Sequence, residues 1–305
     1  MQALIYDPDQ PRGLRLGEAA EPVATPGQAL IDVRAVSLNF GELAYLAGRA
    51  RPGEIPGWDA AGIVVEPAAD GSGPPAGAAV VTFGWGGAWA RRRAVDTAEL
   101  AVLADSTDLG AAAALPVAGV TALRAVRRLG PIVGRRVLIT GASGGVGRFA
   151  VQLAARAGAE VIACVGRPAR GEGLPALGAA QVVVGLTNLT APVFGVLDNV
   201  GGAQLAEAFR LVHDGGVALS IGMASREPTT IDFEQERIRG GNKRLETLVI
   251  GTHLGDDLAY LARLLASGEL DPQIGWRGDW NRAPEAADAL LSRNVAGKAI
   301  LDLPT

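Results

Sequence analysis

The chain contains 305 residues, of which 49% are hydrophobic and 20% are charged, and its formal net charge at pH 7 is −4. This composition is too apolar for a disordered protein, and the length predicts two lobes rather than one core. No basic excess points to nucleic acid, no apolar run approaches the roughly 20 residues of a membrane span, and a single cysteine excludes an internal disulfide. We expect a reduced, cytoplasmic protein that acts on a small molecule, with no nucleic-acid or membrane partner.

The first hundred or so residues predict short strands separated by turns. Strand-like segments span residues 29–36, 61–65 and 78–83, and the turn pair Pro26-Gly27 precedes the first of them. A loop rich in glycine and proline separates the other two. Short, evenly spaced strands with such punctuation are typical of a small barrel or sandwich.

The pattern changes near residue 110, where helices begin to alternate with strands. Residues 136–140 form an uninterrupted apolar run of the kind that a buried parallel strand needs. Further strands are expected at residues 160–165, 181–184, 193–198, 217–221 and 245–250, with a helix at 203–212. This alternation predicts an α/β fold with a doubly wound parallel sheet.

A glycine-rich loop follows the strand at 136–140. Gly141, Gly144 and Gly147 are spaced G-x-x-G-x-x-G, and an amphipathic helix comes next. Such a loop lets backbone amides approach a pyrophosphate and directs a helix N-terminus at its negative charge. The alternative is a turn that merely joins a strand to a helix. The flanking strands favour a dinucleotide site.

The end of the next strand indicates which dinucleotide is preferred. NAD sites place an acidic residue there, whereas this chain has no carboxylate before Glu172 and instead carries Arg167 and Arg170. A guanidinium matches a phosphate monoester in charge and in forked hydrogen bonding. We therefore expect NADPH, with both arginines as candidate contacts to its 2′-phosphate. Two solvated loop arginines are the alternative.

Several motifs together carry a family resemblance. They are residues 36–42 (VSLNFGE), 56–62 (PGWDAAG), 114–122 (ALPVAGVTA), the glycine loop, 197–202 (LDNVGG) and the C-terminal Arg293 with Gly297-Lys298. In this order they resemble the zinc-independent quinone oxidoreductase branch of the medium-chain dehydrogenase/reductase superfamily. Leu38-Asn39-Phe40 also looks like the enoyl-reductase domains of polyketide synthases, which belong to the same superfamily.

The resemblance implies a GroES-like, β-rich catalytic domain over residues 1–112, completed by 268–305, and a Rossmann NADPH-binding domain over 113–267. It also implies NADPH-dependent reduction of a quinone or of a C=C bond conjugated to a carbonyl. Members of the family are often dimers joined partly through strands near residues 245–250, so we expect a homodimer.

The loop, the strand ends and the resemblance together give the candidate site residues. Asn39 and Tyr45 are the catalytic candidates. The expected cofactor contacts are Thr121, Ser143, Gly144, Gly145, Val146, Gly166, Arg167, Arg170, Asn199, Gly222, Thr252 and Lys298. The expected substrate pocket contains Trp58, Phe83, Trp85 and His253.

The sequence departs from the zinc-dependent members of the superfamily. Gly57-Trp58-Asp59 stands where they carry Gly-His-Glu, and the one cysteine, Cys164, lies inside a predicted Rossmann strand. Catalytic zinc needs three protein ligands and an open position. We therefore expect no metal site.

Reduction without a metal needs a hydrogen-bond donor at the carbonyl oxygen and a proton from a side chain or from water. Tyr45 is the only plausible phenolic donor, although relatives often place the tyrosine one position earlier, where this chain has Ala44. A packing role is the alternative for Tyr45. Asn39 could donate from its amide, or could serve only to form a turn.

The aromatic residues Trp58, Phe83 and Trp85, together with Trp89, suggest a lip that stacks a flat apolar substrate. The alternative is that they fill the core of the barrel. The run Arg91-Arg92-Arg93 reads as a solvated strand edge, or else as a means of steering an anionic substrate.

The leading hypothesis is a metal-independent, NADPH-dependent reductase of quinones or α,β-unsaturated carbonyls. One alternative is an enoyl reductase acting on a carrier-bound or secondary-metabolite intermediate. Another is a non-catalytic NADPH-binding protein.

Overall fold

The computed structural model describes residues 1–304 and separates them into two compact units. The first unit comprises Met1–Val120 together with the described residues from Gly251 onward, and the second comprises Thr121–Ile250. These boundaries differ from the expected 112/113 and 267/268. The shift at the C-terminal boundary arises because helix α8 (Gly255–Ala266) packs on β7 (Leu100–Val102) and on the π-helical turn Leu115–Val120, which all belong to the first unit.

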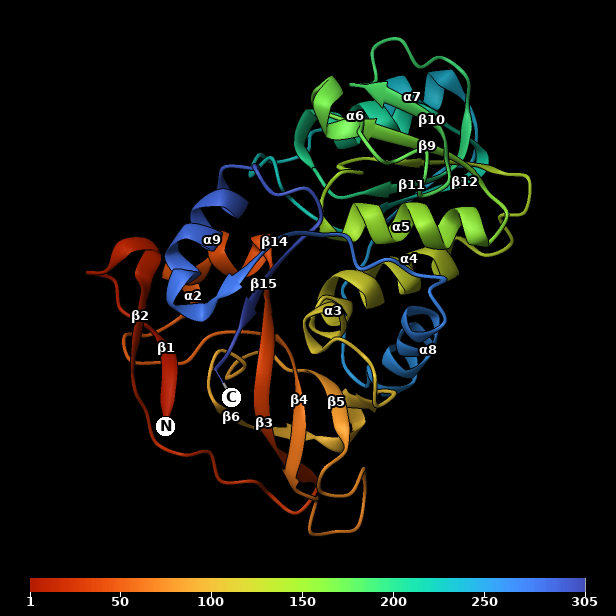
Figure 1. Ribbon diagram of the computed structural model, residues 1–305. Helices are drawn as coiled ribbons and strands as arrows, with labels where there is room; N and C mark the ends of the chain where they lie inside the picture. Colours follow the sequence, from red (N-terminus) through yellow and green to blue (C-terminus); the bar gives the residue numbers. More distant parts are fainter. Residues whose placement is uncertain (305) are drawn as a thin grey trace. The chain divides into compact units, whose positions relative to one another are not determined.

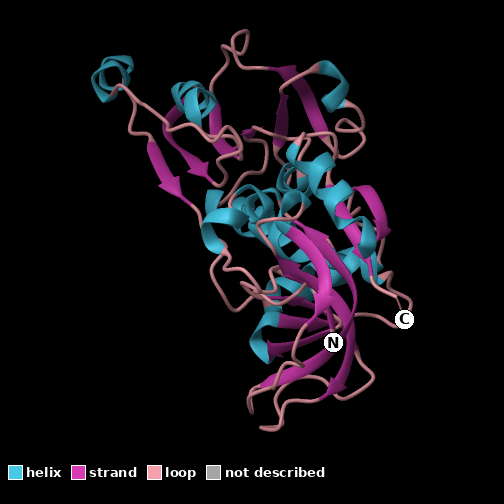
Figure 2. Cartoon of the chain, turned by 90° about the vertical axis from the view of Figure 1, so that its left-hand side faces the viewer, coloured by secondary structure: helices cyan, strands magenta, loops and turns pink. Residues whose placement is uncertain are grey.

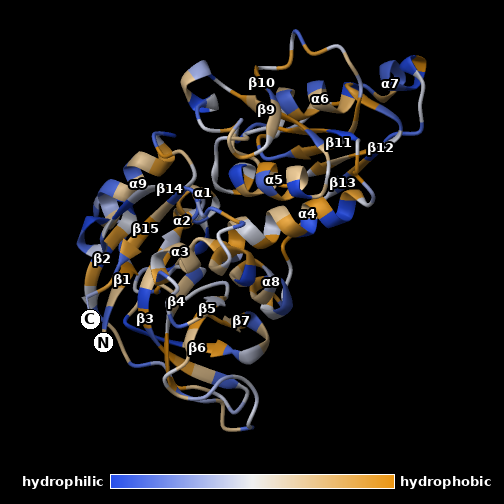
Figure 3. Cartoon of the chain, turned by 45° about the vertical axis from the view of Figure 1, so that its right-hand side comes forward, coloured by the Kyte–Doolittle hydropathy of each residue, from blue (hydrophilic) through white to orange (hydrophobic). Residues whose placement is uncertain are grey.

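The first unit is built on a seven-stranded, mostly antiparallel sheet (Figure 1). Its order is β14 (Ile274–Asp279), β15 (Lys298–Asp302), β3 (Gln28–Leu38), β4 (Asp59–Glu66), β5 (Ala79–Phe83) and β7, with β6 (Arg92–Asp96) also paired to β3. A separate hairpin joins β1 (Gln2–Tyr6) to β2 (Leu14–Glu18). Strands β3, β4 and β5 are buried at most of their positions, as in a sheet covered on both faces, and hydrophobic residues recur along the strands (Figure 3).

Short helices surround this sheet. They are α1 (Phe40–Ala44), α2 (Leu46–Arg49), α3 (Leu109–Ala113) and α9 (Ala283–Leu291). Trp89 and Trp280 are completely buried in the core, among residues of β3, β15 and α9. The register of the β15–β3 pair places Ala299 opposite Leu38, so Lys298 enters the interior beside Asn39, at the start of α1.

The second unit is a six-stranded parallel sheet, as the alternating pattern predicts. Its order is β10 (Ala179–Val184), β9 (Glu160–Val165), β8 (Arg136–Ile139), β11 (Val193–Asp198), β12 (Val212–Ser220) and β13 (Arg244–Thr247). Figure 1 shows α4 (Thr121–Leu129) and α5 (Gly145–Arg156) on one face and α6 (Gly202–Arg210) on the other, and Figure 2 distinguishes these helices from the strands. The helix expected at 203–212 ends at Arg210 because β12 begins at Val212.

The α/β fold class, with a GroES-like sheet unit and a Rossmann-like parallel sheet, is therefore confirmed. The strand order reverses between β8 and β11, and in open parallel sheets such a switch point is where nucleotides bind. In the part of the chain that the structure describes, no helix combines the length and the apolar character needed to cross a membrane.

Candidate active site

The glycine loop connects β8 to α5 at the switch point of the parallel sheet. Gly141 has φ of +58°, and a Cβ atom on Gly147 would lie 2.4 Å from the Gly141 carbonyl oxygen. Glycine is thus required for α5 to pack against the loop. No side chain caps α5, whose N-cap residue is Gly144. The uncapped amides and the helix dipole suit a pyrophosphate, so the loop fits a dinucleotide.

The residues that follow β8 and β11 are hydrogen-bonded to each other beside this loop. The Thr140 hydroxyl donates to Asp198 Oδ1 at 2.5 Å, and the Asn199 amide Nδ2 donates to the Thr140 carbonyl at 2.9 Å. Burial raises the pKa of Asp198, while the bond from Thr140 opposes this shift. A Cβ atom on Gly222 would lie 2.8 Å from the Asn199 carbonyl oxygen, so glycine allows this close approach. Asn199 therefore holds two strand ends in register at the predicted cofactor site.

Arg167 and Arg170 follow β9 and a third arginine lies on α5, and the structure distinguishes their roles. Arg170 donates from Nε to the hydroxyl of Ser143 in the glycine loop at 3.0 Å, whereas Arg167 is exposed. The third, Arg148 on α5, was not predicted. It is 8% exposed, and its Nη2 donates to the Glu172 carbonyl at 2.9 Å, so it anchors the loop that carries Arg170. Its only signal in the sequence is a cation within a helix that is otherwise apolar on its buried face.

The predicted cofactor contacts are divided between the two units. Ten lie in the second unit: Thr121, Ser143, Gly144, Gly145, Val146, Gly166, Arg167, Arg170, Asn199 and Gly222. Thr252 and Lys298 lie in the first unit. Thr252 is exposed and its hydroxyl shares a hydrogen bond with His253 Nδ1 at 3.1 Å. Lys298 is only 2% exposed, and its ammonium is committed to groups inside the unit.

A buried polar cluster surrounds Asn39 in the first unit. The Asn39 amide Nδ2 donates to Asp59 Oδ2 at 2.8 Å and to Glu42 Oε2 at 3.1 Å. Its Oδ1 accepts from Lys298 Nζ at 2.6 Å. Both amide hydrogens are thus already used, and Asn39 could donate to a substrate oxygen only by giving up one of them. The geometry favours the turn-forming role for Asn39, in which it caps α1 together with Glu42.

Burial determines the charges in this cluster. Desolvation, aided by the Asp59 charge, raises the pKa of Glu42 to about 8, so its carboxyl group is protonated at neutral pH. Consistent with this, Glu42 Oε1 is buried and has no hydrogen-bond partner among the described residues. Burial also raises the pKa of Asp59 and lowers that of Lys298, and each charge opposes the shift of the other across 3.6 Å. The cluster therefore combines a protonated Glu42 carboxyl group with a buried contact between Asp59 and Lys298.

Tyr45 directly follows α1. The Arg49 guanidinium lies 5.4 Å from its ring centroid. Its hydroxyl is buried and makes no hydrogen bond within the described chain. A buried hydroxyl without a partner is costly, so Tyr45 has a donor still to be satisfied.

The predicted aromatic residues separate into a core part and an exposed part. Phe83 and Trp89 are buried, at 2% and 0% exposure, as the core alternative predicts. Trp85 is 53% exposed and meets the edges of Trp58 and Phe83 at centroid distances of 5.2 and 5.0 Å. We call Trp58 and Trp85 the aromatic lip. A large aromatic ring exposed to this extent is typical of a binding surface.

The arginine run behind the lip differs from the expectation of a solvated strand edge. Arg93 is 4% exposed and donates to the carbonyl oxygens of Trp58 and Gly84, each at 3.0 Å. The solvated-edge prediction is therefore wrong for Arg93. It fails because β6 pairs with β3 and directs this side chain under the loop that follows β5.

His253 lies at the start of α8, in a strained backbone conformation with φ of +58°. The Glu99 carboxylate holds this turn by accepting from the backbone N–H groups of His253 and Leu254, at 2.6 and 3.1 Å. The His253 side chain is exposed, and its position is set by this turn.

The residues that the structure describes contain no group of three or more His, Cys, Asp or Glu side chains that could hold a metal ion.

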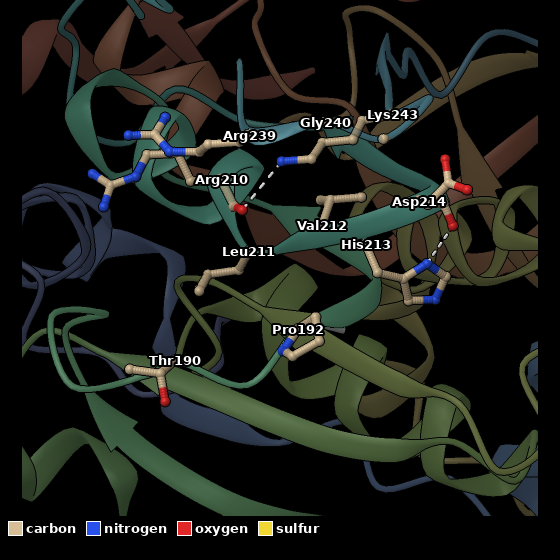
Figure 4. A pocket seen from close by; sticks show the side chains of 11 residues that line it. Thr190, Pro192, Arg210, Leu211, Val212, His213, Asp214, Arg239, Gly240 and Lys243 are labelled. Carbon is tan, nitrogen blue, oxygen red and sulfur yellow. Dashed lines mark hydrogen bonds between the residues drawn. The ribbon is translucent and has the colours of Figure 1, made fainter. Parts of the chain in front are cut away.

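The cavity in Figure 4 has a volume of about 300 Å³ and lies at the opposite end of β12 from Gly222. Arg210, Arg239 and Lys243 are among the residues that line it. Lys243 Nζ donates to the Arg210 carbonyl at 3.2 Å and to Glu236 at 2.9 Å. None of the predicted site residues lines this cavity.

Comparison with known proteins agrees with this geometry. The alcohol dehydrogenase GroES-like domain model matches residues 25–115, and the zinc-binding dehydrogenase model matches residues 177–301. A probable acrylyl-CoA reductase of Escherichia coli is 30% identical over 257 residues, which cover 76% of this chain and 78% of that protein. A spectinabilin polyketide synthase protein of Streptomyces orinoci is 31% identical over 94% of this chain, which spans only 14% of that protein's length.

Solved structures give the same result. The quinone oxidoreductase of Coxiella burnetii is 26% identical with a TM-score of 0.87, and the match covers 100% of this chain and 99% of that one. The Escherichia coli quinone oxidoreductase, solved with NADPH, has the same fold at 22% identity and a TM-score of 0.87, with 99% and 100% covered.

The chain belongs to the medium-chain dehydrogenase/reductase superfamily, in its quinone oxidoreductase branch.

Proposed function

We propose that this protein is an NADPH-dependent reductase of quinones or of C=C bonds conjugated to a carbonyl, and that it acts without a metal. The observation that carries the proposal is the uncapped α5 N-terminus beside a glycine loop whose Ser143 hydroxyl accepts from Arg170. An amide-lined cradle next to a fixed guanidinium suits a dinucleotide with an additional phosphate monoester. The acrylyl-CoA reductase and quinone oxidoreductase relatives support the class of acceptor.

When bound, NADPH would supply hydride to the acceptor. The chain's own residues would do the remaining work. The glycine loop and α5 would hold the pyrophosphate, and Arg170 would hold the 2′-phosphate. The aromatic lip would orient a flat acceptor and exclude water from it. The buried Tyr45 hydroxyl, which lacks a partner among the described residues, would donate a hydrogen bond to the carbonyl oxygen as charge develops there.

The test is NADPH oxidation by purified protein with three acceptor classes: a quinone, a free enone and an enoyl thioester. Turnover of a quinone or an enone, with NADPH bound more tightly than NADH and without added metal, supports the proposal. Tight NADPH binding with no turnover of any acceptor contradicts it and favours the non-catalytic NADPH-binding protein.

An enoyl reductase acting on a carrier-bound thioester is the second candidate. The polyketide synthase and acrylyl-CoA reductase relatives favour it. Activity only on the thioester, with none on free quinones, would distinguish this candidate from the first.

We also propose that the protein is a homodimer, joined through the edge of the parallel sheet. Strand β13 ends the sheet order, and Leu245 and Val249 beside that edge are 37% and 76% exposed. An open strand edge with exposed apolar side chains is suited to pairing with a second copy. Replacement of Val249 by Glu should give a monomer by light scattering, whereas a wild-type monomer would contradict the proposal.

A further inference from the structure

Backbone hydrogen bonds hold the two segments that carry the aromatic lip. Gly84 N–H donates to the Trp58 carbonyl at 3.1 Å, and Gly87 N–H donates to the Ile55 carbonyl at 2.9 Å. The loop that follows β5 is thus tied to the segment that precedes β4. These bonds hold the peptide chain but leave the ring of Trp85 about half exposed.

The side chain of Arg93 binds the same two segments. All four Nη hydrogens are used: Nη1 donates to the Trp58 carbonyl and to Thr82 Oγ1, at 3.0 and 3.2 Å. Nη2 donates to the carbonyls of Gly84 and Gly86, each at 3.0 Å. One guanidinium therefore binds the backbone on both sides of Trp85 and the carbonyl of Trp58. The planar fork of donors in arginine allows this arrangement, whereas the single ammonium group of a lysine does not.

The glycine at position 84 fits this arrangement closely. A Cβ atom there would lie 2.6 Å from Arg93 Nη2, so the guanidinium reaches the loop only because residue 84 has no side chain. Burial lowers the pKa of Arg93 to about 10, with the nearby Asp59 opposing the shift, so the group is charged at neutral pH. Its charge is directed into loop carbonyls and is not offered to an anionic substrate.

We propose that Arg93 is the positioning residue of the aromatic lip, fixing Trp58 and Trp85 so that they present rigid apolar rings to a planar, uncharged acceptor. This inference rests on the proposed function and deepens it. It predicts a preference for flat rings such as quinones, and it replaces the idea that the arginine run steers anions. A preorganised lip lowers the ordering cost of substrate binding, so losing it should act on KM.

The experiment compares Arg93→Met and Gly84→Ala with Arg92→Met, a matched change at the neighbouring, half-buried position in the same run. Gly84→Ala keeps the charge but displaces the guanidinium, and it remains informative if Arg93→Met folds poorly. Turnover is measured with 1,4-naphthoquinone, NADPH affinity by cofactor fluorescence, and lip order by acrylamide quenching of tryptophan emission.

Both lip variants should raise KM for naphthoquinone about fivefold to tenfold, the worth of one aromatic contact, with kcat and NADPH affinity within about twofold. Quenching should increase because Trp85 becomes mobile. Arg92→Met should match the wild type. Trp85→Ala should raise KM to a similar extent, and adding Arg93→Met to the double variant Trp58→Ala/Trp85→Ala should have no further effect on KM.

A further KM rise when Arg93→Met is added to Trp58→Ala/Trp85→Ala would overturn the inference, as would unchanged KM and quenching in both lip variants. If the wild type reduces no acceptor, the proposed function fails. The quenching comparison then still decides whether Arg93 holds the lip.

Discussion

The neutral carboxyl group in the Asn39 cluster leads to a pH-dependent stability that can be worked out from the structure. Glu42 is 4% exposed, and burial raises its pKa from 4.5 to about 8. Between these values the unfolded chain loses the Glu42 proton while the folded chain keeps it. The folded state therefore binds more protons, and the free energy of unfolding must fall as the pH rises through this window.

The size of the effect follows from the shift. One pKa unit corresponds to 1.36 kcal/mol, so the slope contributed by Glu42 is at most about 1.4 kcal/mol per pH unit, and its total over the window is at most about 5 kcal/mol. Glu42→Gln removes the titration but keeps the oxygen that accepts from Asn39 N and Nδ2. The variant should gain stability relative to the wild type between pH 5 and 8, and most of the slope should disappear.

The assay is urea unfolding followed by tryptophan emission at several pH values from 5 to 8. All five tryptophans lie in the first unit, so the signal reports the unit that contains Glu42. The difference between variant and wild type isolates Glu42 from Asp59 and Lys298, whose pKa values are also shifted. Glu66→Gln, at an exposed position at the end of β4, is the matched control and should keep the wild-type slope. Equal slopes in wild type and Glu42→Gln would refute the reasoning.

Three further predictions concern the candidate cofactor site and the contact between Lys298 and Asp59. Arg170→Met should weaken NADPH binding about tenfold to a hundredfold and NADH binding little, because a charged hydrogen bond to the 2′-phosphate is lost. Titration calorimetry measures both affinities, and equal losses would contradict the assignment. Gly144→Val should abolish dinucleotide binding. It should leave the circular dichroism unchanged, since a Cβ atom there would lie 3.4 Å from the nearest backbone atom. Gly147→Val should also disrupt the loop. Lys298→Met should destabilise the first unit by about 3–5 kcal/mol in urea unfolding, because it leaves the Asp59 carboxylate buried without its cation. A loss below about 1 kcal/mol would show that the pair is unimportant.

The strand, glycine loop and helix of the candidate dinucleotide site could be predicted because their determinants are local. Gly141, Gly144 and Gly147 lie within one turn between a strand and a helix, and backbone sterics alone require glycine in such a bend. Arg170 was predicted from its place after the strand at 160–165, where NAD sites carry an acidic residue. Its bond to Ser143 was not predictable, because it depends on how the turn after β9 folds back onto the loop.

The Asn39 cluster could not be read from spacing. Asn39 and Lys298 are 259 residues apart and meet only through the antiparallel register of β3 and β15. That register, and the burial that accompanies it, changed Asn39 from an available donor into a fully bonded cap and placed the Lys298 ammonium in the interior. A sequence pattern contains neither the partner nor the desolvation.

The amino-acid sequence by itself determined the alternation of strands and helices, the glycine loop and the family motifs, since each depends on neighbours a few residues away. Only the tertiary structure decided which polar groups are satisfied and which charges are buried. Arg93 illustrates the difference: in the sequence it is one of three consecutive arginines, and in the fold pairing of β6 with β3 buries it against the backbone carbonyls of Trp58, Gly84 and Gly86. Hydrogen bonding and desolvation act through space, so their consequences appear only when distant segments come together.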